Sequence, residues 1–575
     1  MGVSGIKAQN PNVQIIHNCA DAAATNVKIW ANGSVLVNNL QFRYATAAST
    51  LSPGSYTIGV SLPTATNQNQ SLAQFTVSFL SGVNYYVTAN GIVSGMGYNP
   101  NNTQAPFTLS TYTISQMNAL PGAGQTQVLV HHGCTDAPTV DVVAPFSGTN
   151  PVIPNALVNN AAYTNYSNLL TLNVANYNLQ IRDQNSENVV AEYLAPLQSL
   201  GLGGSRICVV ASGFLVPGNN SSGPAFGLWV ATSAGGSLIP LPTTTVTSTR
   251  AQAIHNCADA AANSVDVWLR SATTGTTGLL LADNFNFRKA TPYVDLPVGQ
   301  TITLSIAPPT STSPVGALAN FTYNLSASSK YQLIASGIVS PIGYTPSNTV
   351  TPFNLIVNAN VRERSLNSIN TDVLVFHGAT DAPAVNVLAV GAGTIVNNMA
   401  YGTFNGAGYL QLASNTPSGN YTLHVTNTAG TSTVASYLAP LNTLSLSGSA
   451  ITVLASGFLN PSNNSNGAAF GLWAALPAGG SLVQLPTYNI TSISEANELL
   501  SSIIVYPNPF VSQLTIQNSE KISLSLSIRD VGGKLVTFVN GSDPQININT
   551  ENLPAGVYIV TLSGNNANQT YKLIK

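Results

Sequence analysis

A fourfold internal repeat is the feature that most constrains what this chain can fold into. The stretch IIHNCADAAATNVKIW begins at Ile15, and the nearly identical AIHNCADAAANSVDVW begins at Ala253. Two further stretches, VHHGCTDAPTVDVVA from Val130 and VFHGATDAPAVNVLA from Val375, keep the histidine and the aspartate at the same spacing. The matched histidines are 115, 123 and 122 residues apart, which predicts four domains of about that size.

The four copies alternate between two kinds. The first and third share HNCADAA, whereas the second and fourth share DAP and the long loops ASGFLVPGNNSSGPAFGLW and ASGFLNPSNNSNGAAFGLW. This A-B-A-B order indicates that a two-domain unit was duplicated whole, and it disfavours a catalytic site confined to one copy. We therefore predict repeats A1 (10–120), B1 (121–245), A2 (246–360) and B2 (361–488).

Composition and turn spacing predict an all-β chain. Charged residues make up only 6% of the sequence, so the helix-favouring Glu, Lys and Arg are scarce. Runs rich in Val, Ile, Leu and Tyr alternate with turn signals at intervals of about 8 to 12 residues, the spacing expected of antiparallel sandwiches. The predicted fold is a tandem array of four immunoglobulin-like β-sandwiches, followed by a smaller C-terminal β-sandwich.

Charge and hydropathy narrow the partners and the location. The net charge is −2 and the 17 basic residues are spread thinly, so we expect no nucleic acid partner. No apolar segment approaches the ~20 residues that a transmembrane helix needs. Residues 1–9 read as the remnant of a secretory signal peptide with Ala8 before the cut, which predicts a mature chain starting near Gln9.

The repeated histidine, cysteine and aspartate admit two interpretations. On a strand, His17, Cys19 and Asp21 would share one face, which is an arrangement that invites a metal ion. In the fourth copy, however, Ala379 replaces the cysteine. The interpretation that we favour is a structural turn in which the aspartate accepts backbone N–H groups and the histidine bonds a neighbouring loop, with no metal and no cofactor. Its residues are His17, Asp21, His132, Asp136, His255, Asp259, His377 and Asp381.

The four cysteines lie at positions 19, 134, 208 and 257. Cys134 and Cys208 belong to the same copy, and a disulfide between them would close a loop of ~75 residues and add several kcal/mol of stability. Cys19 and Cys257 have no partner in their own copies, so they are either free and buried or joined across copies.

The tryptophans also occupy matched positions, one in each copy. Either a sandwich core or an exposed sugar-stacking platform accounts for such a residue, and Trp229 and Trp473 are the candidates for glycan stacking. The chain lacks the Gly-x-Ser-x-Gly elbow of hydrolases and the phosphate-binding Gly-Lys-Ser/Thr loop, and it has few carboxylates outside the turn motif. We therefore expect no enzyme activity.

Two family resemblances follow from these motifs. The HxxxDAPxVxV core, with Asp136-Ala137-Pro138 and Asp381-Ala382-Pro383, resembles the DUF4397 family of extracellular bacterial repeats. The A copies carry Ala in place of the proline and share the surrounding pattern, so that the resemblance covers most of residues 10–488. It implies β-sandwich domains outside the cell, and it implies no particular activity.

The C-terminal segment is similar to the type A sorting domain of the type IX secretion system. After a polar linker (489–502), residues 503–575 contain VYPNPF, IRDVGGKLV, LPAGVYIVTL and a terminal YKLIK in the order typical of that domain. The alternating runs indicate a small sandwich of seven strands with a hairpin at Gly532-Gly533. The residues that carry the resemblance are Tyr506, Pro507, Asn508, Pro509, Gly533, Lys534, Gly556, Tyr558 and Lys572.

This second resemblance implies export by the type IX secretion machinery, removal of the segment, and release or attachment to surface lipopolysaccharide. Together with the uncharged repeats, it predicts a secreted, non-enzymatic structural or adhesive protein of the cell surface. Such a chain has little electrostatic repulsion to keep copies apart, so self-association into fibres or matrix is expected. The alternative is a carbohydrate-binding array that attaches cells or partner proteins to extracellular polysaccharide.

Overall fold

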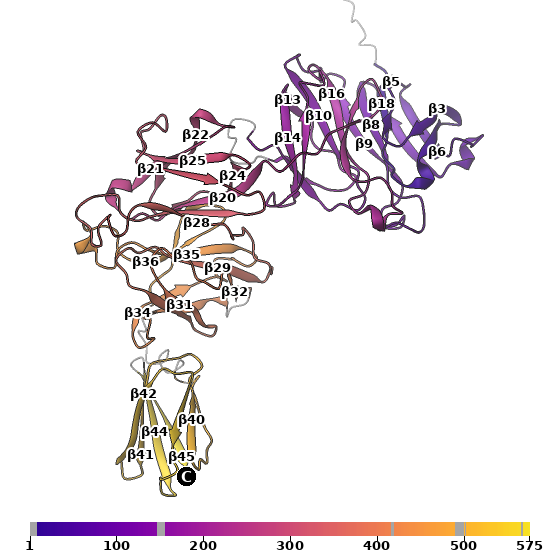
Figure 1. Cartoon of the computed structure of the whole chain (residues 1–575). Helices are drawn as coiled ribbons and strands as arrows, with labels where there is room; N and C mark the ends of the chain where they lie inside the picture. The colour runs from indigo at the N-terminus through magenta and orange to yellow at the C-terminus, as the bar shows by residue number, and fades with distance from the viewer. Residues whose placement is uncertain (1–8, 147–155, 416–418, 489–499, 501, 565–566) are drawn as a thin grey trace, which may run out of the picture. The chain divides into compact units, whose positions relative to one another are not determined.

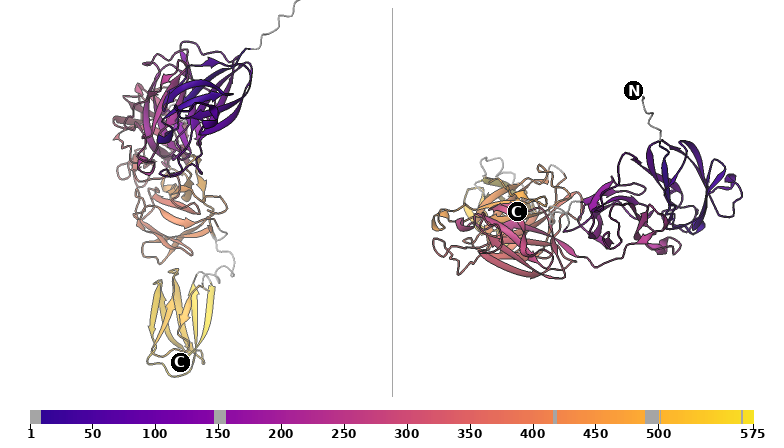
Figure 2. Two further views of the ribbon diagram at one scale, coloured as in Figure 1. Left: turned by 90° about the vertical axis from the view of Figure 1, so that its right-hand side faces the viewer. Right: turned by 90° about the horizontal axis from the view of Figure 1, so that it is seen from above.

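The structure is a computed structural model that describes residues 9–146, 156–415, 419–488, 500, 502–564 and 567–575. Over these residues the chain is all-β, with strands joined by loops and short 3-10 turns (Figures 1 and 2). In the described part of the chain, no helix has both the length and the apolar character to cross a membrane. Residues 1–8 of the predicted signal remnant and most of the predicted linker lie outside the described residues.

The chain divides into two compact units, Met1–Ser248 and Thr249–Lys575. The first unit contains A1 and B1, and the second contains A2, B2 and the C-terminal sandwich. Each of these five domains consists of two packed sheets. The all-β sandwich architecture expected from composition and turn spacing is therefore confirmed.

A1 pairs a sheet of order β18-β4-β1-β8-β9, in which β5 also pairs with β1, with a sheet of order β3-β2-β6-β7. Strands β1 and β8 run parallel, and His17 lies opposite Ala89. The strands of A1 are β1 (Asn12–His17), β2 (Asn26–Ala31), β3 (Ser34–Gln41), β4 (Tyr44–Ala45), β5 (Ser49–Thr50), β6 (Gly54–Ser61), β7 (Ala73–Phe79), β8 (Val83–Asn90) and β9 (Thr108–Ser115).

B1 repeats this plan with sheets of order β13-β10-β16-β17-β19 and β12-β11-β14-β15. Its parallel pair is β10 and β16, in which His132 lies opposite Ala211. Its strands are β10 (Gln125–His132), β11 (Val140–Val143), β12 (Ala156–Ala161), β13 (Leu170–Asn173), β14 (Asn176–Asp183), β15 (Val189–Pro196), β16 (Arg206–Ser212), β17 (Gly227–Thr232) and β19 (Ile239–Pro240), together with β18 (Gly236–Ser237), which joins the A1 sheet.

A2 and B2 reproduce A1 and B1. Their sheets have the orders β28-β27-β20-β23-β37, β22-β21-β25-β26, β32-β29-β35-β36-β38 and β31-β30-β33-β34, and β24 pairs with β20. The A2 strands are β20 (Ser248–His255), β21 (Ser264–Ser271), β22 (Gly275–Asn286), β23 (Lys289–Ala290), β24 (Val294–Pro297), β25 (Thr301–Ala307), β26 (Ala319–Asn324), β27 (Tyr331–Ser336) and β28 (Asn354–Asn358). The B2 strands are β29 (Asn370–His377), β30 (Val385–Ala389), β31 (Gly393–Met399), β32 (Leu410–Ala413), β33 (Tyr421–Asn427), β34 (Thr433–Ala439), β35 (Ala450–Ser456), β36 (Gly471–Ala475), β37 (Gly480–Ser481) and β38 (Val483–Gln484).

The central sheets are buried on both faces, which explains their almost continuous apolar sequences. In A1, Val13 and Ile15 of β1 point into the sandwich core, whereas Ile16 points towards B1. On that second face, Tyr86 of β8 packs with Leu129 of β10 in one cluster. Figure 1 shows β8 and β9 facing β10 and β16 within the first unit. An A-B pair is therefore a stack of four sheets with three apolar layers.

The C-terminal sandwich has seven strands among the described residues. Its sheets have the orders β39-β40-β43 and β42-β41-β44-β45. Gly533 adopts φ +82° in the hairpin between β41 and β42, a conformation that favours glycine, as the sequence indicated. The strands are β39 (Ile504–Tyr506), β40 (Gln513–Gln517), β41 (Leu524–Asp530), β42 (Leu535–Gly541), β43 (Gln545–Asn549), β44 (Val557–Gly564) and β45 (Ala567–Ile574).

Candidate functional site

The four repeated histidines end the first strand of their domains and are buried. In A1 and A2, Nε2 of His17 and His255 donates to the carbonyl oxygens of Ala24 and Ala262, each at 2.7 Å. In B1 and B2, Nε2 of the matched rings donates to the carbonyl oxygens of two prolines, from His132 to Pro138 at 3.1 Å and from His377 to Pro383 at 3.0 Å. Each ring therefore holds the loop that follows its own strand.

Burial keeps these imidazoles neutral. It lowers the pKa of His17 and of His255 to about 4, although the hydrogen bond to the loop carbonyl acts in the opposite direction. The pKa values of His132 and His377 are also lowered by burial. A neutral ring that donates through Nε2 is not available as a proton donor at neutral pH, so the geometry indicates a structural part for these residues.

The aspartates of the A copies fasten two loops together. Asp21 accepts the backbone N–H groups of Ala23 at 2.9 Å, Val93 at 2.8 Å and Ser94 at 2.6 Å, and it also accepts the Ser94 hydroxyl at 2.9 Å. Asp259 makes the same four contacts in A2, with Ala261, Val339 and Ser340. Burial alone would raise the pKa of Asp21, but the hydrogen bonds from Ala23, Ser94 and Val93 outweigh it, and the pKa lies below its ordinary value.

The aspartates of the B copies fasten the equivalent loops with different partners. Asp136 accepts the backbone N–H groups of Leu215 at 2.8 Å and Val216 at 2.9 Å, and the side-chain amide of Asn220 at 2.9 Å. In B2, Asp381 accepts the matched groups of Leu459, Asn460 and Asn464 at 2.7 to 3.0 Å. In all four copies the carboxylate thus joins the first loop to the loop that follows the second strand of the parallel pair.

Most of the atoms that a metal ion would need are engaged within the protein, whereas Nδ1 of His17 is buried without a hydrogen-bond partner. His17 donates to Ala24, the Asp21 carboxylate accepts four donors, and the Cys19 thiol donates to the carbonyl oxygen of Gly91 at 3.0 Å. Throughout the described ranges, no three His, Cys, Asp or Glu side chains come together in a way that could hold a metal ion. The alternate spacing on one strand does not produce a ligand set, because the chain leaves the strand at His17.

The predicted disulfide between Cys134 and Cys208 is wrong, because all four thiols are free and buried. In the parallel pair of β10 and β16, Cys208 lies opposite Leu129, five positions before Cys134. A disulfide needs Cα atoms roughly 4 to 7 Å apart, and successive strand residues advance by about 3.3 Å, so the two residues are too far apart. The Cys134 thiol instead donates to the Asp136 carboxylate at 3.1 Å, and Cys208 faces the A1–B1 contact.

Trp229 and Trp473, the candidates for glycan stacking, are only partly exposed, and an arginine covers one face of each ring. The Arg43 guanidinium lies over the Trp229 ring at 4.1 Å, and the Arg288 guanidinium lies over the Trp473 ring at 4.2 Å. Both rings pack against the apolar cluster between the A and B copies of their unit. The A-copy tryptophans, Trp30 and Trp268, are buried in their own domains.

Arg43 connects A1 to B1 through several contacts besides the tryptophan. Its Nε donates to the Ser212 hydroxyl at 3.0 Å, and its Nη2 donates to the carbonyl oxygens of Ser212 at 3.1 Å and Ala225 at 2.8 Å. Arg288 makes the same contacts with Ser456 and Ala469 in the second unit, at the same distances. Burial lowers the pKa of both arginines to about 10, so they remain charged at neutral pH.

Sequence reasoning did not find this A–B contact, although a signal was present. The stretches QFRYAT, which contains Arg43, and NFRKAT, which contains Arg288, lie at matched positions of the A copies. In a chain with only 17 basic residues, a recurring arginine of this kind points to a repeated partner. That partner is the matched tryptophan of the following B copy.

Two asparagines reinforce the same contact. Asn18 donates to the carbonyl oxygen of Gly133 at 3.0 Å, and Asn256 donates to that of Gly378 at 3.3 Å. In addition, β18 of B1 pairs with β4 of A1, and β37 of B2 pairs with β23 of A2. The A–B contact is therefore apolar in its centre, joined by backbone pairing at one edge, and repeated residue by residue in the two units.

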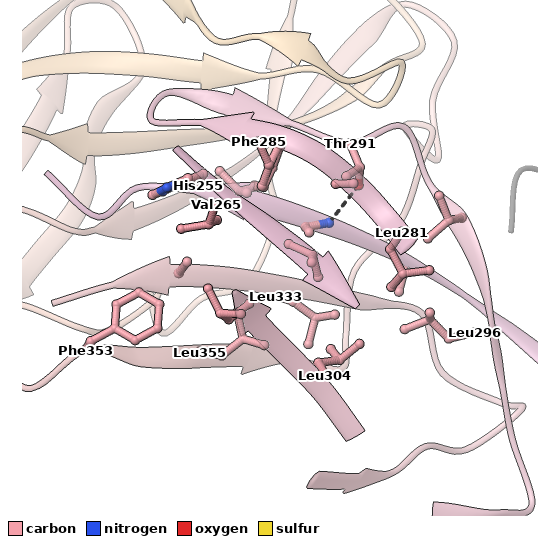
Figure 3. Close-up of a pocket in the computed structure, with 18 residues that line it drawn as sticks. His255, Val265, Leu281, Phe285, Thr291, Leu296, Leu304, Leu333, Phe353 and Leu355 are labelled. Atoms are coloured by element: carbon pink, nitrogen blue, oxygen red, sulfur yellow. Dashed lines mark hydrogen bonds between the residues drawn. The ribbon is translucent and has the colours of Figure 1, made fainter. Parts of the chain in front are cut away.

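The interior of the A domains offers little space. In A2 a cavity of about 30 Å³ lies between the sheets, and Figure 3 shows Phe285, Leu281 and Phe353 among the side chains that surround it. Its lining is apolar apart from His255 and Thr291. The Thr291 hydroxyl accepts the backbone N–H of Ala253 at 2.9 Å, which is the dashed line in Figure 3. Both ring nitrogens of His255 bond the protein, since Nε2 donates to the carbonyl oxygen of Ala262 and Nδ1 accepts the backbone N–H of Cys257 at 3.3 Å.

The sorting-signal residues hold the end of the chain in place. Asn508 accepts the backbone N–H of Ile574 at 2.9 Å and donates to the carbonyl oxygen of Lys572 at 3.2 Å, so the loop with Pro507 and Pro509 clasps β45. Gly556 and Lys575 exchange two backbone hydrogen bonds at 2.9 and 3.2 Å.

The remaining signal residues shape turns in the same domain. Tyr558 is buried and donates its hydroxyl to the carbonyl oxygen of Pro554 at 2.8 Å. Gly533 and Lys534 form the turn that Asp530 caps, with the Lys534 N–H donating to the Asp530 carboxylate at 3.0 Å. Tyr506 ends β39 with its ring partly exposed. These residues therefore help to shape the turns and the last strand of one folded domain.

Two protein-family models match this chain, one near its N-terminus and one at its C-terminus. Residues 504–575 match the secretion system C-terminal sorting domain, and residues 11–143 match the domain of unknown function DUF4397. The second match includes all of A1 and continues through β10 and β11 of B1, across the predicted boundary at residue 120. No curated protein matches the chain.

Three solved structures show limited similarity. The TIE protein of Bacillus anthracis is 8% identical, the match covers 85% of this chain and 72% of that chain, and the TM-score is 0.11. PorZ of Porphyromonas gingivalis, described as a surface component of the type IX secretion system, is 11% identical, the match covers 92% of this chain and 69% of that chain, and the TM-score is 0.16. The BSP domain of a biofilm associated protein is 11% identical, the match covers 85% of this chain and 95% of that chain, and the TM-score is 0.12. TM-scores this low do not establish a common architecture.

The sorting domain identifies a protein that is secreted, attached to the cell surface and handled by the type IX secretion machinery. The chain carries a DUF4397 domain at residues 11–143 and a type IX secretion C-terminal sorting domain at residues 504–575.

Proposed function

We propose that this chain is a non-enzymatic structural or adhesive component of the cell surface, in which each A-B pair acts as one rigid building unit. The repeated A–B contact carries this proposal. Arg43 with Trp229 and Arg288 with Trp473 reproduce the same set of contacts, and an apolar cluster fills the space between the sheets in both units. Two neighbouring domains that moved independently would not be expected to keep the same interdomain contacts in both copies after duplication.

The turn motif supports the same proposal. Its aspartates, its cysteines and Nε2 of its histidines bond neighbouring groups of the protein, and burial lowers the pKa of the imidazoles. A catalytic acid needs a proton within reach of a substrate, and the proton on Nε2 of each ring is already donated to a loop of its own domain. The motif joins the loops at the ends of the domains, which suits a structural or surface-coating array.

We further propose that the exported chain is held on surface lipopolysaccharide and associates with its own copies or with extracellular polysaccharide. The low charge of the repeats favours close packing of copies, because little electrostatic repulsion opposes it. A contact repeated by both A-B units would generate fibres unless the rotation between copies closes a ring.

An in-frame deletion tests this proposal. The deletion strain, complemented either with the full chain or with a chain that carries Arg43→Ala and Arg288→Ala, is compared with the parent for surface adhesion and matrix formation. We expect the deletion to reduce both, the full chain to restore them, and the double variant to restore them only in part when equal amounts reach the surface. Normal adhesion and matrix in the deletion strain would contradict a structural or adhesive role.

A further inference from the structure

The two B domains contain matching apolar pockets that are several times larger than the cavities of the A domains. The pocket of B1 has a volume of about 180 Å³ and that of B2 about 170 Å³. The cavities at the corresponding place in A1 and A2 measure about 20 and 30 Å³. The matched lining pairs include Pro138 and Pro383, Val142 and Val387, Val190 and Val434, Leu215 and Leu459, Phe226 and Phe470, and Leu228 and Leu472.

A difference in the loop after the histidine explains why only the B copies are hollow. In A1 the loop forms a short 3-10 turn, η1 (Ala22–Ala24), that buries Ala24 within the core, and A2 does the same with η4 (Ala260–Ala262). From the histidine to the matched valine of the facing sheet, the A1 loop advances ten positions (His17 to Val27) and the B1 loop eight (His132 to Val140), so the B loop is two residues shorter, and it has no such turn. The space beneath the Asp-Ala-Pro loop therefore stays open.

Side-chain size adds to this difference in the first unit. Leu40 pairs with Val27 of β2 in A1, and the smaller Ala161 pairs with the matched Val140 of β11 in B1. In A2 the matched residue is Phe285, which Figure 3 shows reaching into the A2 core. In B2 it is Met399, which lines the pocket without filling it.

The pockets open through an apolar rim on the protein surface. In B1, Val190 is 55% exposed and Leu215 is 39% exposed, and in B2 the matched Val434 and Leu459 are 50% and 37% exposed. Exposed Pro138 and Pro383 complete the two rims. Empty apolar volume inside a sandwich is destabilising in proportion to its size, yet both B copies retain it after duplication while both A copies fill it.

We propose that each B domain binds one small, uncharged apolar molecule about the size of a single aromatic ring. An apolar cavity of about 150 Å³ is known to stay dry and to take up benzene, so 170 to 180 Å³ suits a ligand of that size or slightly larger. The walls are aliphatic and aromatic apart from neutral histidines, His131 and His132 in B1 and His377 in B2, and therefore a charged ligand would lose its hydration without finding a charged partner. The described residues form two such sites, one in each B domain, and the proposal is independent of the structural role above.

Fluorine NMR of fluorobenzene, titrated against the full-length chain, tests the proposal. We expect saturable binding of two molecules per chain. Val190→Trp and Val434→Trp place an indole at the rim of each pocket, so each single variant should bind one molecule and the double variant none. Val216→Trp is the matched control, because Val216 is similarly exposed and adjacent to Leu215 but does not line the pocket, and it should still bind two.

A second pair of variants, Leu215→Gln and Leu459→Gln, covers the case in which the tryptophan variants unfold. These change the opposite side of each rim to a polar side chain, and the double variant should weaken binding at least tenfold while the thermal unfolding midpoint stays near that of the wild type. The absence of saturable binding to the wild type would overturn the proposal. Binding that stays at two molecules per chain in a folded double variant would overturn it equally.

Discussion

Replacing Asp21 with alanine tests whether the repeated aspartate fastens the two loops of its domain. The carboxylate is 1% exposed and accepts the N–H groups of Val93 and Ser94 at 2.8 and 2.6 Å. A buried donor left without a partner costs about 1 to 3 kcal/mol, so the two amides together account for about 2 to 6 kcal/mol. Since about 1.4 kcal/mol corresponds to a factor of ten, the loop should open at least about 30 times more often in Asp21→Ala.

Hydrogen exchange followed by mass spectrometry on the full chain measures this opening. Peptides that contain Val93 and Ser94 should exchange at least about 30-fold faster in the variant than in the wild type. The matched loop of A2, held by Asp259, provides an internal control and should be unchanged. Asp21→Asn keeps one acceptor oxygen and should have a smaller effect. Exchange at Val93 and Ser94 within threefold of the wild-type rate would refute the fastening role.

Three further predictions follow from the other buried groups. Arg43→Ala removes three hydrogen bonds and the stacking on Trp229, so it should weaken the A1–B1 contact by about 2 to 4 kcal/mol. The backbone amides of β18 should then exchange hydrogen faster than in the wild type, and an unchanged exchange rate would contradict this prediction. Burial lowers the pKa of His17 to about 4, so the unfolded chain binds a proton more readily than the folded one, and the free energy of unfolding should fall as the pH drops from about 6.5 to 4. In urea titrations, His17→Gln should reduce the dependence of this free energy on pH. The same pH dependence in the variant and the wild type would count against the prediction. Burial raises the pKa values of the four thiols, so maleimide without reductant should label none of them in the folded chain and all four in the denatured chain. Fewer than four labels after denaturation would reveal a disulfide. The thiols are those of Cys19, Cys134, Cys208 and Cys257.

The features that sequence alone predicted are those governed by local spacing. Strand and turn alternation within each copy is a short-range pattern, and it predicted the all-β sandwiches. The C-terminal motifs have a fixed order over about 70 residues and were enough to predict the sorting domain, which the family match at 504–575 confirms. A turn such as the one at Gly533 depends on the backbone freedom of one residue and is equally readable.

The features that sequence missed depend on how sheets pack against each other. A strand buried on both faces does not reveal which face meets its own core, so Trp229 could not be assigned to the A–B contact. The disulfide prediction failed because two cysteines in one copy say nothing about their register, and Cys208 proved to lie opposite Leu129. The larger pockets of the B domains arise because the loop after the histidine is two residues shorter than in the A domains. The structural propensities of single residues do not predict such a difference.

Cryo-electron tomography of the native cell surface, comparing the parent with the in-frame deletion strain, tests the central claim most directly. We expect a surface layer or fibres built from repeating A-B units in the parent, and their loss in the deletion strain. An identical surface in both strains, with the chain released into the medium as separate monomers, would contradict it.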